Sequence, residues 1–362
     1  MDTNATPVHL VTADPPAKGK KQGGSLWLYA VVRLLLIIPT IFILTTLVFI
    51  LMRLTGDPIT AAMGGRLSAA ELAQRVHAAG YDRPMITQYL QYLGHTFTGN
   101  FGTTMSDNRP VTQILTTYGA ATLELAFYSL IVAFVVGIPL GMIAAYYRDK
   151  GQDAWLRVFA ILWYATPVFF SGLLLKLVFS IWLGWLPVAG RATTGSEITL
   201  QFLPHRTNIY LIDALRTGNV SIVWDVLQHA VLPAVALGLL TAGIFLRLVR
   251  ANVIGTLSTD YVEAARSRGV GEFRLVRKHA YRPALIPIIT VMGLQIALLL
   301  GGAVLTETTF EWRGLGFELV QYLDARDFVA VQGIVILLAI IVAVTNFIVD
   351  LVAALIDPRV RY

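Results

Sequence analysis

Six long apolar stretches alternate with polar segments along the 362-residue chain. Each is about as long as the roughly 20 apolar residues that a membrane-spanning helix needs. This pattern predicts an all-α, polytopic membrane protein with six transmembrane helices. The predicted spans are about 31–52, 120–146, 158–183, 229–249, 283–305 and 328–356.

The polar segments divide the chain into a tail and a transmembrane domain. Residues 1–25 are rich in Pro, Gly and Lys, and we predict a disordered cytoplasmic tail. A signal peptide is disfavoured because the following apolar run is too long. Residues 26–362 form the transmembrane domain, with outer excursions at 53–118 and 184–228.

The first excursion carries helix signals and is too structured for a linker. Ser68 with Glu71 predicts a capped helix to about Ala79, and Pro84 suits the first turn of another, to about Phe97. We therefore predict a small lid-like subdomain outside the membrane. In the third span, Pro167 predicts a kink.

Loop charges predict the orientation. Lys and Arg gather in the tail, in the loop after the second span, in the loop after the fourth span and at the C-terminus. Because cytoplasmic loops carry the basic excess, both termini are predicted to be cytoplasmic. The net charge of +6 then indicates contact with anionic lipid rather than with nucleic acid.

The loop at 258–282, between the fourth and fifth spans, is basic and amphipathic. Asp260 is predicted to cap a short helix, with Glu263 as its reciprocal partner, and Gly269 to end that helix. A second short helix is predicted from Glu272 to about Ala280. The small residues of the first helix permit the close approach of a partner.

Composition and missing motifs limit the chemistry. The chain is 56% hydrophobic and 14% charged, against about 45–50% and about 25% in soluble domains. It has no cysteine, its six histidines show no metal spacing, and no GxxxxGK[ST] phosphate-binding motif occurs. We predict no catalytic residue, no metal site and no cofactor on this chain, so uphill transport would need a partner or an ion gradient.

The loop also resembles a known element. Glu263-Ala264-Ala265, then Gly269 and Leu285-Ile286-Pro287, are similar to the EAA loop of ABC-transporter permeases. More widely, the chain from about Trp27 onward resembles the B-type permease subunit of bacterial dipeptide/oligopeptide ABC importers. Motifs that carry this resemblance include Thr55-Gly56-Asp57-Pro58, Ala121-Thr122-Leu123-Glu124-Leu125, the GIPLG run at Gly137, Glu307-Thr308 and Gly314-Leu315-Gly316. Arg313 stands where that family usually has a proline.

The resemblance implies an ABC type I importer permease in a bacterial plasma membrane. Its implied partners are a related permease forming a heterodimer, two ATP-binding subunits that bind ATP and Mg²⁺, an extracytoplasmic substrate-binding protein and a peptide substrate. The residues implied in coupling to the ATPase are Asp260, Tyr261, Glu263, Ala264, Ala265 and Gly269. Nickel chelates, glutathione and haem stay open as alternative cargoes. A stand-alone secondary transporter or channel, or an intramembrane enzyme, is disfavoured because no internal repeat and no nucleophile–base set is evident.

Among the ionisable residues of the predicted spans, we single out Glu124 and Lys176, which are predicted to lie at similar depths below the outer surface. Such residues cost about 2.5–3.5 kcal/mol on insertion scales and usually face a cavity or each other. Our hypothesis is that both face the substrate pathway and pair with each other. The alternative for Lys176 is that its ammonium group extends to the outer interface.

Overall fold

The computed structural model describes residues 26–54, 56–65 and 67–356, and within them the side chains of much of 286–300 and of residues 353 and 356 are not described. The predicted tail at 1–25 lies outside the described residues. Helices form nearly all of the described chain, and the strand-like pairing in it is an isolated bridge between Thr103 and Pro110. The all-α prediction is confirmed.

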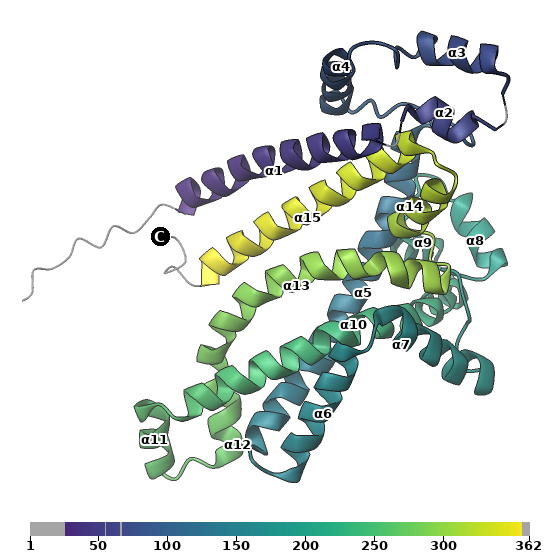
Figure 1. Ribbon diagram of the computed structural model, residues 1–362. Helices are drawn as coiled ribbons and strands as arrows, with labels where there is room; N and C mark the ends of the chain where they lie inside the picture. The colour runs from purple at the N-terminus through teal and green to yellow at the C-terminus, as the bar shows by residue number, and fades with distance from the viewer. Residues whose placement is uncertain (1–25, 55, 66, 357–362) are drawn as a thin grey trace, which may run out of the picture.

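Figure 1 shows long helices that run side by side, with shorter ones gathered at their ends. The long helices coincide with five of the predicted spans and extend beyond most of them. They are α1 (Leu26–Leu54), α5 (Val111–Tyr146), α10 (Val220–Leu257), α13 (Tyr281–Phe310) and α15 (Phe328–Ile356). Among the described residues, α1, α5, α10 and α15 are long and apolar enough to cross a membrane.

The third predicted span, 158–183, is not one kinked helix. Helix α6 (Gly151–Ala165) and helix α7 (Val168–Leu175), which continues as the π-helix η1 (Lys176–Trp182), are bent by 106° relative to each other. The break lies at Thr166, whose extended backbone (φ −80°, ψ 128°) is the conformation favoured before a proline. Pro167 therefore ends one helix and starts another, giving a broken span or a re-entrant loop.

Helices α5 and α10 pack with almost no space between their backbones. A Cβ atom on Gly137 would lie 2.8 Å from the Ala242 carbonyl oxygen, and one on Gly141 would lie 2.7 Å from Cβ of Val249. Gly238 of α10 faces α5 in the same way, with a Cβ 2.6 Å from the Ser129 carbonyl oxygen. Small residues that let backbones touch are the usual basis of helix association in membranes. The GIPLG run is thus part of this contact.

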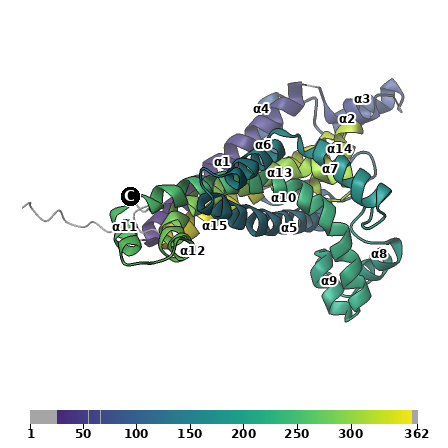
Figure 2. The ribbon, with the colours of Figure 1, turned by 90° about the horizontal axis from the view of Figure 1, so that it is seen from below.

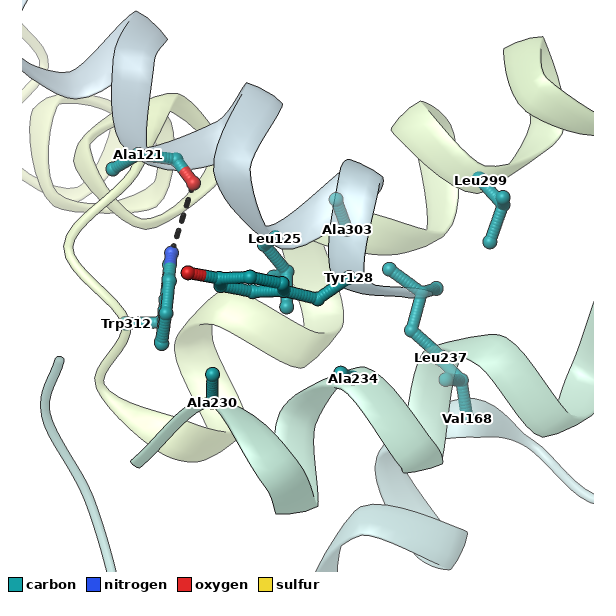
Figure 3. Close-up of a cluster of buried hydrophobic side chains, with 10 residues drawn as sticks. All are labelled: Ala121, Leu125, Tyr128, Val168, Ala230, Ala234, Leu237, Leu299, Ala303 and Trp312. Atoms are coloured by element: carbon teal, nitrogen blue, oxygen red, sulfur yellow. Dashed lines mark hydrogen bonds between the residues drawn. The ribbon is translucent and has the colours of Figure 1, made fainter. Parts of the chain in front are cut away.

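A buried apolar cluster joins α5, α7, α10 and α13 near the end of this contact (Figure 3). Trp312, which follows α13, is fully buried in it, and its indole N–H donates a 3.0 Å hydrogen bond to the Ala121 carbonyl. The remaining residues of the cluster are Leu125, Tyr128, Val168, Ala230, Ala234, Leu237, Leu299 and Ala303. This cluster fixes the loop after α13 against α5.

The short helices of the excursions lie at one end of the long helices, and α11 and α12 at the other (Figure 2). The first excursion contains α2 (Pro58–Met63), α3 (Ala69–Ala78) and α4 (Met85–Phe97), the second contains α8 (Thr194–Gln201) and α9 (Tyr210–Thr217), and α14 (Leu315–Asp324) precedes α15. The capping box of Ser68 and Glu71 is present, as predicted. The predicted helix after Pro84 is α4.

Candidate functional site

The loop at 258–282, which we call the coupling loop, folds back onto the ends of α10 and α13. It comprises α11 (Asp260–Ser267), the single turn α12 (Glu272–Arg274) and the π-helix η2 (Leu275–Ala280), which leads directly into α13. Val262 is fully buried among Leu257, Leu275 and Ala284. One side of α11 is therefore anchored to both long helices.

The ends of α11 are built partly as predicted. The N-cap residue is Thr259, which makes no side-chain capping bond, and Asp260 is the first residue of the helix. The predicted capping pair of Asp260 and Glu263 is therefore wrong, because the helix starts one residue earlier than that pairing requires. At the other end Gly269 has φ +81°, and the amide of Val270 donates to the Ala265 carbonyl at 3.3 Å. Gly269 thus ends the helix in a Schellman motif, as predicted.

The opposite side of α11 is exposed. Tyr261 is 49% exposed, and Glu263, Ala264 and Gly269 are exposed as well, while Ala265 is half-buried. A Cβ atom at Gly269 would have no neighbour within 4 Å. Apart from Ala265, the residues predicted to couple the chain to an ATPase are therefore left exposed by the described part of the chain.

The coupling loop is braced by charges beside this surface. Arg266 donates from Nε to Glu272 at 2.7 Å, which ties α11 to α12, and its Nη1 lies 3.8 Å from Glu263. The hydrogen bond to Glu272 raises the pKa of Arg266. Glu263, by contrast, has no closer charged partner in the described part of the chain.

At the other end of the long helices, Glu124 is buried and accepts four hydrogen bonds. The donors are Nη2 of Arg191 at 2.5 Å, the Tyr128 hydroxyl at 2.9 Å, and the amides of Tyr210 and Leu211 at 3.2 and 2.8 Å. The two amides belong to the first turn of α9, so the carboxylate stabilises the positive end of that helix. Glu124 thus holds the second excursion onto α5.

The predicted pair of Glu124 with Lys176 is not formed. Lys176 donates from Nζ to the Thr309 carbonyl at 2.8 Å and lies 5.5 Å from the centre of the Phe310 ring. Glu124 is instead neutralised by Arg191, which comes from the second excursion. Sequence reasoning missed Arg191 because nothing in its neighbourhood along the chain indicates a partner on α5.

A second buried carboxylate, Glu307, lies at the end of α13. It accepts from the Thr122 hydroxyl at 2.7 Å and from the Phe317 amide at 2.9 Å. Gly314 and Gly316 let the loop after α13 pass close to Glu307, because neither has a side chain. A Cβ on Gly314 would lie 2.4 Å from Oε1 of Glu307, and one on Gly316 would lie 2.5 Å from Cα of Val304. The motifs at 121–125, 307–308 and 314–316, far apart in the chain, thus converge here, and we call Glu124, Arg191, Glu307 and their partners the glutamate cluster.

No three His, Cys, Asp or Glu side chains converge on a possible metal position within the described ranges. The arrangement offers two features that transport could use: an uncovered helix face at one end and a polar cluster, with a cavity beside it, at the other.

Comparison with known proteins identifies the family. The profile of the family described as "Binding-protein-dependent transport system inner membrane component" matches residues 137–362. The chain belongs to this family. It is therefore a permease component of an ABC importer, located in the inner membrane of a bacterium.

Relatives extend the match over nearly the whole chain. The di/tripeptide transport system permease protein of Pseudomonas aeruginosa is 38% identical over 332 residues, covering 91% of this chain and 97% of that protein. The dipeptide transport system permease protein of Escherichia coli is 36% identical over 91% of this chain and 97% of the relative. The glutathione transport system permease protein of Salmonella typhimurium is 34% identical over 92% and 99%.

A solved structure has the same fold. A chain of the MetNI methionine ABC transporter, in inward-facing conformations, matches with a TM-score of 0.50 at 18% identity, covering 68% of this chain and 98% of that one. The predicted type I importer permease fold is confirmed.

Proposed function

We propose that this chain forms one half of the translocation pathway of an ATP-driven importer of di- or oligopeptides. The observation that carries this is the exposed, small-residue face of α11, which Val262 anchors to α10 and α13. An ATP-binding subunit seated there would move both long helices together. The peptide cargo is supported by relatives named for di- and tripeptide transport that align over nearly their full length.

The proposed assembly has a second, related permease, two ATP-binding subunits and an extracytoplasmic binding protein. ATP and Mg²⁺ would bind to the ATP-binding subunits, and this chain would carry no catalytic residue of its own. Its Tyr261–Gly269 segment would transmit closure of the ATPase pair to the membrane helices and so alternate the access of the pathway.

We also propose that both termini and the coupling loop face the cytoplasm. Because the chain has no cysteine, single-cysteine labelling can test this directly. Ser267→Cys and Thr194→Cys, both at exposed positions, would be treated in intact cells with a membrane-impermeant maleimide. We expect labelling of Thr194→Cys alone; labelling of Ser267→Cys in intact cells would contradict this topology.

Transport by the reconstituted complex tests the function. The complex with its binding protein, in proteoliposomes, is expected to import dipeptides and tripeptides only with ATP inside. Uptake without ATP-binding subunits would instead favour a stand-alone secondary transporter. Glutathione belongs in the same ligand panel because of the relative from Salmonella typhimurium. Uptake of glutathione but of no other peptide would identify glutathione, rather than dipeptides in general, as the cargo.

A further inference from the structure

A polar cavity of about 220 Å³ lies beside the glutamate cluster. Its walls come from the first turns of α5, from α8 and the start of α9, and from the loop after α13. These are parts of the three segments that the proposed topology puts outside the membrane. The lining residues used below are Arg109, Arg191, Glu197, Arg206, Asp213 and Arg313.

Arg191 is the buried part of this wall. Its side chain is 5% exposed, and its guanidinium lies 3.6 Å from the centre of the Tyr210 ring. Both of its hydrogen bonds are made by Nη2, to Glu124 and to the Asn208 carbonyl, and Nε has no partner in the described residues. A guanidinium has five N–H donors, so Arg191 retains donors after neutralising Glu124.

The other arginines leave the cavity positive. Arg206 donates from Nη1 to the Gln201 carbonyl and has no acidic partner in the described residues, while Arg313 is exposed and makes no hydrogen bond there. Arg109 is paired with Asp107 at 2.5 Å.

The two carboxylates of the wall already have donors. Glu197 is 3.2 Å from the Tyr210 hydroxyl, and Asp213 accepts from the amides of Thr207 and Asn208 at 2.9 Å each. Burial raises the pKa of Tyr210 to about 12, so that hydroxyl keeps its proton. The lining side chains thus comprise four arginines and two carboxylates, and this excess of positive charge favours an anionic ligand.

We propose that this cavity receives the C-terminal carboxylate of a peptide at the outer entrance of the pathway, an inference that rests on the proposed function. Its volume is below the 300–1,000 Å³ of sites that enclose whole small molecules, so it fits the end of a ligand. Arginine forks match a carboxylate with two parallel hydrogen bonds. The rest of the peptide would extend away from the cavity.

The test uses the assembled importer in proteoliposomes with saturating amounts of the peptide-loaded binding protein. In the double variant Arg206→Gln/Arg313→Gln we expect uptake of trialanine to fall about tenfold. A fall of this size corresponds to the loss of one hydrogen bond to a charged group, worth ~1.5 kcal/mol. Uptake of trialanine amide is expected to stay at the wild-type rate. Arg206→Lys/Arg313→Lys, which keeps the charge, is expected to recover part of the trialanine uptake.

Arg326→Gln is the matched control, because Arg326 is an exposed arginine of the same segment as Arg313 but does not line the cavity. If the double variant instead needs more binding protein for half-maximal ATPase stimulation, and loses both substrates equally, the cavity is a docking surface for that protein and the proposal is wrong. Unchanged trialanine uptake would also overturn it. If the wild-type complex imports neither trialanine nor trialanine amide, the proposed function itself is contradicted.

Discussion

Two glutamates near opposite ends of the long helices have opposite surroundings. Glu124 is buried and accepts four hydrogen bonds, whereas Glu263 is exposed and, among the described residues, has Arg266 as its charged neighbour, at 3.8 Å. Two glycines repeat the contrast, since Gly316 is pressed against Val304 and Gly269 has open space around it. Motif residues around Glu124 and Glu307 thus satisfy one another, while the exposed ones on the coupling loop are free for the partner that we propose.

The largest expected effect comes from the buried glutamate. Glu124→Ala would leave Arg191 charged, buried and unpaired, and should lower the free energy of unfolding by about 3–5 kcal/mol. Thermal unfolding of the detergent-solubilised chain would measure this. Glu263→Ala is the matched control and should unfold like the wild type while losing peptide-stimulated ATPase activity in the complex. If the two variants unfold at the same temperature, Glu124 does not stabilise the fold more than Glu263 does, and the contrast between the two glutamates is wrong.

The next effect concerns Gly316, the glycine packed beside Glu307. Gly316→Ala would put a methyl group 2.5 Å from Cα of Val304, and overpacking of this kind costs about 1–3 kcal/mol. Gly301→Ala, where a Cβ meets nothing within 4 Å, should have no such cost. The two variants can be compared by the temperature at which each aggregates in detergent. A wild-type value for Gly316→Ala would show that the loop around Glu307 can move aside.

Gly269→Leu should separate coupling from folding. The added side chain blocks close approach of an ATP-binding subunit, and the positive φ costs about 1–2 kcal/mol for a residue with a Cβ. We expect normal membrane insertion but ATP hydrolysis uncoupled from transport. Gly269→Asn, which tolerates that backbone conformation, controls for the strain. Normal transport by Gly269→Leu would contradict a docking role for α11.

The smallest expected effect is on cargo preference. Our proposal that Lys176 faces the pathway predicts that Lys176→Met shifts the ratio of uptake between acidic and basic dipeptides a few-fold, whereas Lys176→Arg does not. If both variants keep the wild-type ratio, the contacts of Lys176 with Thr309 and Phe310 are its whole role.

Features that depend on nearby residues were predictable from the sequence. Hydropathy placed the long helices, Ser68 with Glu71 indicated a helix start, and Gly269 indicated a helix end. Each of these signals acts within a few residues of its own position. The predicted cap at Asp260 failed by one residue, which is the usual uncertainty at helix ends.

Features that depend on distant residues were not predictable in this way. Pro167 indicated a kink, but the 106° bend depends on how α7 packs against α10 and α13. Glu124 was recognised as costly to bury, yet its partner Arg191 is 67 residues away along the chain. The motif residues Thr122, Glu307 and Gly314 were noted separately, and only the fold brings them into contact.

The length of helix α10 bears on how a movement at one end of the molecule would reach the other. It runs without interruption for 38 residues from the second excursion to the coupling loop, a rod about 57 Å long at 1.5 Å per residue. Its close contacts with α5 at Gly137, Gly141 and Gly238 hold the two helices together, so we expect them to move as a pair. If the helix tilts by about 1° as a rigid rod with one end fixed, its other end moves by about 1 Å.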